Sequence, residues 1–265
     1  MRRSTLDLLR CPWCAAGSLV PDADVAEPAL IFGPVRCLGC RHTWAVHEGL
    51  IDLAPERPSA KGLQQAMELP WVARSWERYV RPAVDVVLTR GQLDRDSEYV
   101  AMRSMLGAPV GPVIDLGCGP GVFLKRLVRD LPNVNVIGVD ISRPMIEEAM
   151  AQFRELQLAA DFVRAEAPPL PFLDACLGGI LASGLVHFVA DLDRLLAEAR
   201  RVLKPRGRFV ASTYDASTAT RRLHLGAGLH PRSEVELKRA AEQAGFIRFE
   251  RIRTGSVMVW STELP

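Results

Sequence analysis

The stretch from Val113 to Gly121 constrains the fold more than any other part of this sequence. It reads Val-Ile-Asp-Leu-Gly-Cys-Gly-Pro-Gly, an apolar run that leads directly into a glycine-rich turn. The amphipathic pattern of residues 122–128 then predicts a helix. Glycines let the backbone pass close beneath a ligand, and the free N–H groups at the start of a helix can bind the ligand's polar groups. The stretch therefore predicts a strand–turn–helix unit with a ligand at the turn.

Two carboxylates indicate which ligand the turn accepts. A second apolar strand, residues 134–140, ends in Asp140, which lies 19 residues after Gly121. An acid at this distance can bind both ribose hydroxyls of a nucleoside. Asp115 lies two residues before the first glycine and would repel the pyrophosphate of a dinucleotide. The pair favours a nucleoside with a cationic amino-acid end, such as S-adenosylmethionine.

Four motifs, in the same order along the chain, resemble those of class I S-adenosylmethionine-dependent methyltransferases. They are Asp115–Gly121, Gly138–Ser142 followed by Met145, Ala165–Phe172 and the turn Arg201–Gly207. Residues 186–189, Val-His-Phe-Val, are similar to a stretch of ubiquinone/menaquinone-type small-molecule methyltransferases. Two positions depart from the pattern: Gly178-Gly179 lacks the acid common at the start of the fourth strand, and Arg206 replaces a usual glycine.

The resemblance implies a cofactor site and a candidate base. Asp115 and the glycines would hold the methionine end of the cofactor, Asp140 its ribose and Glu166 its adenine amino group. His187 is the candidate general base, required only if the acceptor must lose a proton. Alternative roles stay open: Asp140 and Glu166 as solvated acids, and His187 as a packing residue. The implied cofactor-binding residues are Asp115, Gly117, Cys118, Gly119, Gly121, Asp140, Ile141, Met145, Ala165, Glu166, Ala167 and Ser183.

Four of the six cysteines form two Cys-x-x-Cys pairs near the amino end. Cys11 and Cys14 are separated from Cys37 and Cys40 by 22 residues. Two such turns complete the tetrahedral thiolate shell that suits Zn²⁺, and the metal would supply the folding free energy of a segment of about 50 residues. Disulfides and a redox pair are less consistent with a reducing compartment and this context. His42 lies close enough to compete as the fourth ligand.

The amino-terminal segment also resembles a second family. Arg41-His42, and Glu48–Leu50 before Leu53–Pro55, are similar to the zinc ribbon of 23S rRNA guanine-N1 methyltransferases. The ribbon joined to this core is similar as well to uncharacterised plastid methyltransferases. Residues 1–56 carry five arginines and seven carboxylates, within a chain of net charge +2. A phosphate-binding surface needs the opposite sign, so RNA is a possible but disfavoured partner.

Three functions follow in order of preference. The first is a methyltransferase acting on a small-molecule acceptor, with secondary metabolism as a candidate context. The second is a 23S rRNA guanine-N1 methyltransferase. The third is a non-catalytic cofactor- or partner-binding module, suggested by the missing acid at Gly178-Gly179. The sequence does not indicate the acceptor atom or an oligomeric state.

The predicted architecture is an α/β fold. It has a Rossmann-like seven-stranded class I methyltransferase sheet, a small zinc ribbon and a helical lid. The predicted domains are a ribbon at 1–56, a helical linker and lid at 57–106, and an S-adenosylmethionine-binding domain at 107–265. Within them, the proline-containing stretch 54–60 predicts a linker and 233–245 a helix. The predicted strands are 112–116, 134–139, 161–164, 178–183, 207–213, 247–252 and 257–262.

Membrane association is not expected. No apolar stretch reaches the ~18–20 residues of a membrane helix, and Asp7 and Arg10 interrupt any apolar leader at the amino end. We therefore expect a cytoplasmic protein.

Overall fold

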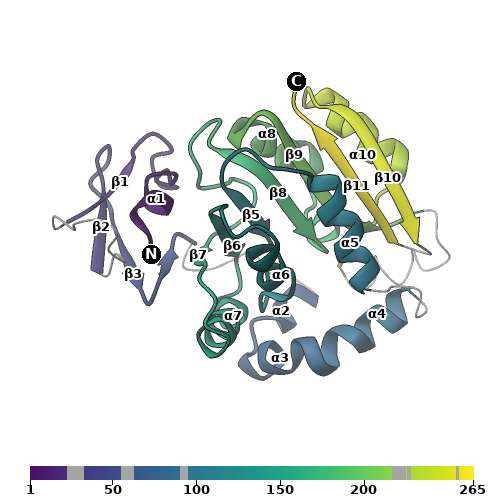
Figure 1. Cartoon of the computed structure of the whole chain (residues 1–265), viewed down its shortest axis with the longest axis horizontal. Helices are drawn as coiled ribbons and strands as arrows, with labels where there is room; N and C mark the ends of the chain where they lie inside the picture. Colours follow the sequence, from purple (N-terminus) through teal and green to yellow (C-terminus); the bar gives the residue numbers. More distant parts are fainter. Residues whose placement is uncertain (23–32, 55–62, 90–94, 217–224, 226–227, 255–256) are drawn as a thin grey trace.

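One mixed sheet organises the molecule (Figure 1). The computed structural model describes residues 1–22, 33–54, 63–89, 95–216, 225, 228–254 and 257–265. Within them, eleven strands form the order β1-β2-β3-β4-β7-β6-β5-β8-β9-β11-β10. The strands are β1 Leu19–Pro21, β2 Gly33–Cys37, β3 Thr43–His47, β4 Leu50–Asp52, β5 Val113–Leu116, β6 Val136–Asp140, β7 Asp161–Arg164, β8 Leu177–Ser183, β9 Leu203–Tyr214, β10 Ile247–Thr254 and β11 Val257–Glu263.

The seven strands from β7 to β10 contain the predicted Rossmann-like core. β7, β6, β5, β8 and β9 run parallel, and β11 and β10 close the edge as an antiparallel pair. Each lies within a few residues of its predicted range. β9 starts earlier than predicted because residues 203–207 join the sheet through a register shift. There Arg206, at the usual glycine position, has a φ of +63°, in the left-handed region that glycine favours.

Within the described residues, the sheet has four strands beyond the seven predicted for the core, because the ribbon extends it. β4 pairs in parallel with β7, with Leu50 opposite Phe162 and Asp52 opposite Arg164. β1 to β4 continue outward as antiparallel neighbours. Without β4, the N–H and C=O groups along this edge of β7 would lack strand partners. The predicted division at residue 56 stays a prediction, whereas the sheet itself runs through both parts.

Helices cover both faces of the sheet. α5, α6 and α7 contribute to one buried apolar cluster, and α8 and α10 pack into the other. α10 begins at a capping box formed by Ser233 and Glu236, and Gly245 follows its end with a φ of +85°. The prediction of this helix is therefore confirmed. The helices are α5 Arg95–Leu106, α6 Val122–Asp130, α7 Arg143–Glu155, α8 Leu192–Val202 and α10 Glu234–Gln243, with the short α1 Arg3–Leu6 and the 3₁₀ turn η2 Val186–Phe188.

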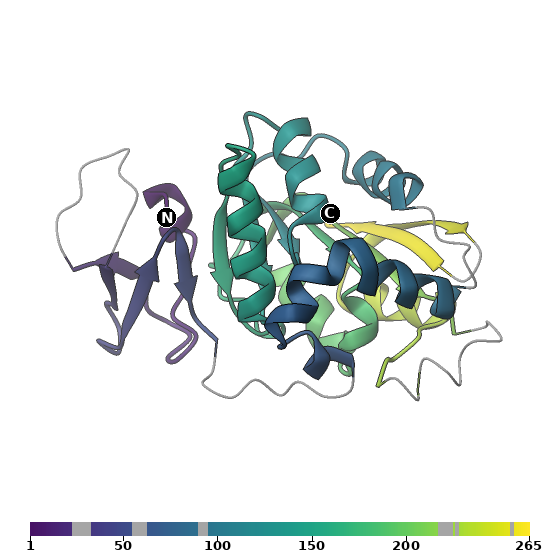
Figure 2. The ribbon, with the colours of Figure 1, turned by 90° about the horizontal axis from the view of Figure 1, so that it is seen from below.

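The predicted helical lid is a series of short helices. They are α2 Leu63–Ala66, α3 Pro70–Ser75, the π-helical turn η1 Trp76–Val80 and α4 Arg81–Thr89. Seen from below, they lie across the front of the molecule (Figure 2). Pro82 is the second residue of α4, where a residue that cannot donate its backbone N–H is tolerated. Residues 55–62 and 90–94 of the predicted linker and lid lie outside the described residues.

A buried carboxylate fixes the amino end of the chain to the sheet. Asp161, in β7, has a side chain that is only 3% exposed. It accepts hydrogen bonds from the Arg2 backbone N–H at 3.0 Å, from Arg2 Nε at 2.6 Å and from Thr5 Oγ1 at 2.5 Å. Residues of the ribbon's first turn therefore depend on a residue of the core.

Replacing Asp161 with alanine should destabilise the fold. The change leaves the Arg2 guanidinium and the Thr5 hydroxyl without their acceptor, which costs about 2–4 kcal/mol for a buried charged group. We expect urea unfolding to show that loss and the midpoint of thermal unfolding to fall by several degrees. Asp7→Ala is the control, because its pair with Arg3 is exposed and worth under about 1 kcal/mol. Equal stability of the two variants would contradict the prediction.

Candidate active site and candidate metal centre

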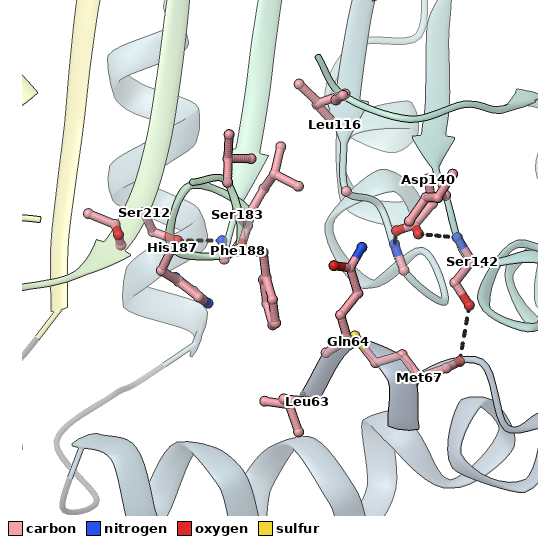
Figure 3. A pocket seen from close by; sticks show the side chains of 18 of the residues that line it. Leu63, Gln64, Met67, Leu116, Asp140, Ser142, Ser183, His187, Phe188 and Ser212 are labelled. Atoms are coloured by element: carbon pink, nitrogen blue, oxygen red, sulfur yellow. Dashed lines mark hydrogen bonds between the residues drawn. The ribbon is translucent and has the colours of Figure 1, made fainter. Parts of the chain in front are cut away.

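A cavity of about 710 Å³ opens at the carboxyl ends of the central parallel strands. Its walls come from the turn after β5, the ends of β6 and β8, and the lid, which contributes Leu63, Gln64 and Met67 (Figure 3). β5 lies between β6 and β8, where the chain order of the sheet reverses. This is the position at which open α/β sheets bind ligands, and the volume suits a nucleoside-sized ligand with an acceptor beside it.

The glycine-rich turn leaves space for a ligand at the start of α6. Gly119 has a φ of +52°, and a Cβ built on it would meet no atom within 4 Å. The side-chain position is therefore open, and both Gly117 and Gly119 line the cavity. A methyl group at this position would project into that space and strain the backbone.

Asp140 is fixed at the end of β6 by backbone donors. Its Oδ2 accepts the Gly119 N–H at 2.8 Å, and its Oδ1 accepts the Ser142 N–H at 2.8 Å. Figure 3 shows the hydrogen bond between Asp140 and Ser142. Burial raises the pKa of Asp140, although these N–H groups and Arg164 oppose the rise. Ser142 Oγ donates to the Met67 carbonyl at 3.0 Å and so connects the lid to this loop.

Asp115 lies behind the cavity wall. Its side chain is buried in β5, and it is not among the residues that line the cavity. Burial raises its pKa to about 7; the charge of Asp140 adds to the rise and Arg81 opposes it. Asp115 would therefore act on a ligand's cationic end through the electric field of its carboxylate beneath the turn, without direct contact.

The structure brings most of the predicted site residues together. Cys118 and Gly121 join Asp115 behind the wall: the Cys118 thiol is buried, and Gly121 lies against Phe153 and Ala149 of α7. The predicted residues that line the cavity are Gly117, Gly119, Asp140, Ile141, Met145, Ala165, Glu166, Ala167, Ser183 and His187. The roles assigned to individual residues stay predictions.

His187 lies on the far wall of the same cavity. The turn η2 holds it 5% exposed, with its ring centroid 4.3 Å from that of Tyr214 and 4.8 Å from that of Phe188. Its backbone carbonyl accepts the His230 N–H at 2.6 Å, and His230 also lines the cavity. His224 lies outside the described residues. An imidazole in this place can contact a bound acceptor.

Comparison with known proteins shows the enzyme class of this domain. Residues 113–207 match the family model described as "Methyltransferase domain". The match includes the turn, Asp140 and His187. These residues form an S-adenosylmethionine-dependent methyltransferase domain. The enzyme class expected from the sequence is confirmed.

Two relatives and one solved structure are similar to this chain. An uncharacterized chloroplastic methyltransferase of Arabidopsis thaliana is 26% identical over 99% of this chain and 80% of its own length. The ubiquinone/menaquinone biosynthesis C-methyltransferase of Desulfotalea psychrophila is 37% identical over 47% of this chain, which spans 49% of that relative. Geranyl diphosphate C-methyltransferase from Streptomyces coelicolor, in complex with S-adenosyl-L-homocysteine, shares the fold with a TM-score of 0.57 at 16% identity, over 64% of this chain and 76% of that one.

Sequence reasoning missed the polar inner wall of the methyltransferase cavity. Glu98 of α5 is 4% exposed, and its Oε1 accepts hydrogen bonds from Ser183 Oγ at 2.9 Å and Ser212 Oγ at 2.6 Å. Within the described residues, Glu98 Oε2 and the buried Thr213 Oγ1 have no hydrogen-bond partner. One sequence signal was available: Glu98 shares a helical face with the buried Met102 and Met105, where a carboxylate is out of place.

The lid helix α4 and the start of α5 form a second group of charges that the sequence did not indicate. Arg95 Nη1 lies 3.2 Å from Asp85 Oδ2, and Arg81 Nε lies 3.7 Å from the same oxygen. Arg81 and Asp85 line the cavity. Because charged residues in helices are usually solvated, their sequence pattern alone predicts surface positions.

The four amino-terminal cysteines meet in one cluster with the geometry of a metal centre. Their sulfur atoms lie within 4.8 Å of one another, with Cys14 to Cys37 at 3.6 Å and Cys11 to Cys40 at 3.8 Å. A tetrahedral shell with Zn–S bonds near 2.3 Å requires S···S separations of about 3.8 Å, whereas a disulfide needs about 2.05 Å. A Cβ on Gly17 would lie 2.1 Å from Cys37 Sγ, so the shell leaves no room for a side chain there.

His42 does not belong to this cluster. Its ring stacks on Trp13, with ring centroids 5.2 Å apart, and contacts Trp44, with centroids 4.4 Å apart.

None of the helices in the described part of the chain is long and apolar enough to cross a membrane.

Proposed function

We propose that this chain transfers the methyl group of S-adenosylmethionine to a neutral small molecule that carries a hydroxyl or N–H group. The observation that carries the proposal is a single cavity that joins the glycine-rich turn and Asp140 to Ser183, His187 and Glu98. Cofactor and acceptor can therefore lie side by side in it. Methyl transfer from a sulfonium needs chiefly alignment and exclusion of water, which a covered cavity provides.

The residues at the turn indicate which end of the cavity would hold the cofactor. S-adenosylmethionine supplies an electrophilic methyl group on a sulfonium of positive charge. The chain's part is to hold it: Asp140 at the ribose, Glu166 at the adenine, and Gly117 and Gly119 beneath the methionine end. Five carboxylates and two guanidiniums line the cavity, so its charge complements a cationic cofactor: Asp85, Glu98, Asp140, Glu166 and Asp191, with Arg81 and Arg194.

The acceptor end is the inner wall formed by Glu98 and Thr213. A buried carboxylate oxygen without a partner favours a ligand that donates a hydrogen bond, and Phe188 and Val257 supply apolar surface nearby. The same carboxylate disfavours a phosphate or another anion. If the acceptor hydroxyl must lose its proton, His187 accepts that proton as the methyl–oxygen bond forms and the methyl–sulfur bond breaks.

The ribosomal RNA alternative rests on the ribbon. Trp13 is 73% exposed and stacked on His42, a surface on which a base could stack. Against it stand the carboxylates of the ribbon and cavity. The non-catalytic alternative rested on Gly178-Gly179. In the fold a Cβ on Gly179 would lie 2.6 Å from Leu106 Cδ1, so packing against α5 accounts for the absence of a side chain at this position.

The deciding experiment offers two acceptor classes to the purified chain. S-adenosyl-[methyl-³H]methionine is incubated with a panel of hydroxylated aromatic small molecules or with unmodified 23S rRNA. We expect label in the organic extract and none in the RNA. Label in RNA, with binding that weakens steeply as salt rises, would establish the ribosomal function instead. Cofactor binding without label in either fraction would favour the non-catalytic module.

His187→Ala should separate chemistry from cofactor binding. If His187 removes the acceptor proton, kcat should fall by about 10²–10³, while the Kd for S-adenosylhomocysteine stays within about twofold. Initial rates and calorimetric titration measure the two quantities. His47→Ala, an exposed histidine on β3, is the control. Full turnover in the His187 variant would exclude the histidine as a base.

We also propose that Cys11, Cys14, Cys37 and Cys40 hold one structural Zn²⁺. The sulfur separations support this, and the ion would stabilise a ribbon too small to fold on apolar burial alone. Metal analysis of the purified chain should give one zinc per molecule. Cys37→Ser should lose it, whereas Cys176→Ser, a cysteine beside β8, should keep it.

A further inference from the structure

Arg164 connects the ribbon to the ribose end of the cavity. It is the last residue of β7, and its side chain is 11% exposed. Its Nη1 lies 3.1 Å from both carboxylate oxygens of Asp52 in the ribbon strand β4. Its Nε donates to the Ile141 carbonyl at 2.9 Å, directly after Asp140. One guanidinium thus binds the ribbon on one side and the cofactor loop on the other.

The sheet register places these groups in one row. Asp52 pairs with Arg164 across β4 and β7, and Arg164 pairs with Asp140 across β7 and β6. Backbone bonds continue the row, because Leu53 N donates to the Arg164 carbonyl at 2.8 Å and Ala165 N donates to the Asp140 carbonyl at 3.0 Å. Asp52 also accepts from Arg143 at the start of α7. The row ends at Ile141 and Ala165, which both line the cavity.

A nearly buried guanidinium depends on its carboxylate partners. Arg164 has Asp52 beside it on the ribbon side, and its charge opposes the rise that burial causes in the pKa of Asp140. Without Asp52, Arg164 would lose an ion pair and would be free to turn toward Asp140 or to solvent. Either movement changes the charge and the backbone position at the acid that is predicted to bind the ribose.

We propose that Asp52 and Arg164 are positioning residues for the cofactor, so that folding of the zinc ribbon sets the affinity for S-adenosylmethionine. The inference rests on the proposed cofactor site and zinc centre. It assigns the ribbon a part in cofactor binding, in addition to its own stability. Neither residue needs to touch the cofactor, since they act through Ile141 and Asp140.

The test measures S-adenosylhomocysteine binding to the full chain by calorimetry, with zinc content and thermal unfolding recorded for each protein. Asp52→Asn keeps the side-chain shape and removes the charge, and we expect a Kd about fivefold weaker. Arg164→Ala should weaken binding about tenfold, and Arg164→Lys should fall between it and the wild type. The double variant Asp52→Asn/Arg164→Ala should match Arg164→Ala, because both act through one contact.

Glu48→Gln is the matched control. The Glu48–Arg154 pair, at 2.5 Å, also joins the ribbon to α7, but it is exposed and does not line the cavity. We expect wild-type affinity and one zinc per chain in this variant. Unchanged affinity in folded, zinc-loaded Asp52→Asn and Arg164→Ala would overturn the proposal, as would an equal loss in Glu48→Gln.

Zinc removal supplies the second arm. A strong chelator should weaken S-adenosylhomocysteine binding by wild type about as much as Asp52→Asn does, and added Zn²⁺ should restore it. Chelation should add little to the loss in Arg164→Ala. Undiminished binding after complete zinc removal would overturn the dependence on the ribbon. A wild-type chain that binds no S-adenosylhomocysteine would refute the proposed cofactor site itself, and one that contains no zinc would refute the metal centre.

Discussion

Asp140→Asn is expected to weaken S-adenosylhomocysteine binding by about 100-fold. The carboxylate fixes the Gly119 and Ser142 N–H groups, and Asp140 lines the cavity. An amide turns one of the two oxygens into a donor, so one backbone N–H loses its acceptor and the ribose hydroxyls lose a charged one. A loss of about 3 kcal/mol corresponds to this factor.

Calorimetric titration of S-adenosylhomocysteine measures the effect. Asp96→Asn serves as the control, because its side chain is 86% exposed in an ion pair with Arg126 and does not line the cavity. That variant should keep wild-type affinity. A Kd for Asp140→Asn within threefold of wild type would contradict the role of Asp140 at the ribose.

Asp115→Asn should stabilise the cofactor-free chain while it weakens cofactor binding. The pKa of this buried carboxyl is raised from 3.8 to about 7. Between these values the folded state holds a proton that the unfolded state has released, so the contribution of Asp115 to stability falls as pH rises and levels off above pH 7. The full difference amounts to at most about 4 kcal/mol. Asparagine removes this cost, and the gain should be larger at pH 8 than at pH 5.

Cofactor affinity should change with pH in the opposite direction to stability. A cationic amino-acid end is stabilised by the ionised carboxylate, so wild-type affinity for S-adenosylhomocysteine should rise as pH increases through 7. Asp115→Asn should bind at least tenfold more weakly at pH 8 and lose this rise. Urea unfolding at pH 5 and pH 8, with titrations at pH 6 and pH 8, tests both parts. A stability gain that is equal at both pH values would show that Asp115 is ionised in the folded chain throughout.

Local sequence patterns predicted much of the fold. The strand–turn–helix at 113–128 requires glycine beside an apolar run, and Ser233 with Glu236 forms a capping box at the start of the helix predicted over 233–245. The paired cysteines likewise bring their own turns, so their spacing predicted the cluster that the structure contains. Each of these signals lies within 30 residues of sequence, where the chain's own geometry limits what can form.

The inner wall gave only the weak local signal of Glu98 on an apolar helical face, and the ribbon contacts gave none. Glu98 lies in a charged run typical of a solvated helix, and only the packing of α5 against β8 and β9 brings it to Ser183 and Ser212. Arg164 similarly ends a short strand, and its partner Asp52 lies 112 residues earlier in the chain. Their meeting depends on the order of strands in the sheet, which side-chain patterns do not encode.

The sequence by itself determined the glycine-rich turn, the position of the acid at the end of β6, the cysteine cluster and the core strands, because each follows from periodicity, backbone freedom or ligand spacing over a short range. The tertiary structure decided that β4 joins β7, which converts a separate ribbon into the edge of an eleven-stranded sheet. It also decided that Glu98 is buried at the cavity and that Arg164 is buried between Asp52 of β4 and the loop after β6. The physical reason is the same for both: an open strand edge and a buried charge are satisfied only by partners distant in sequence.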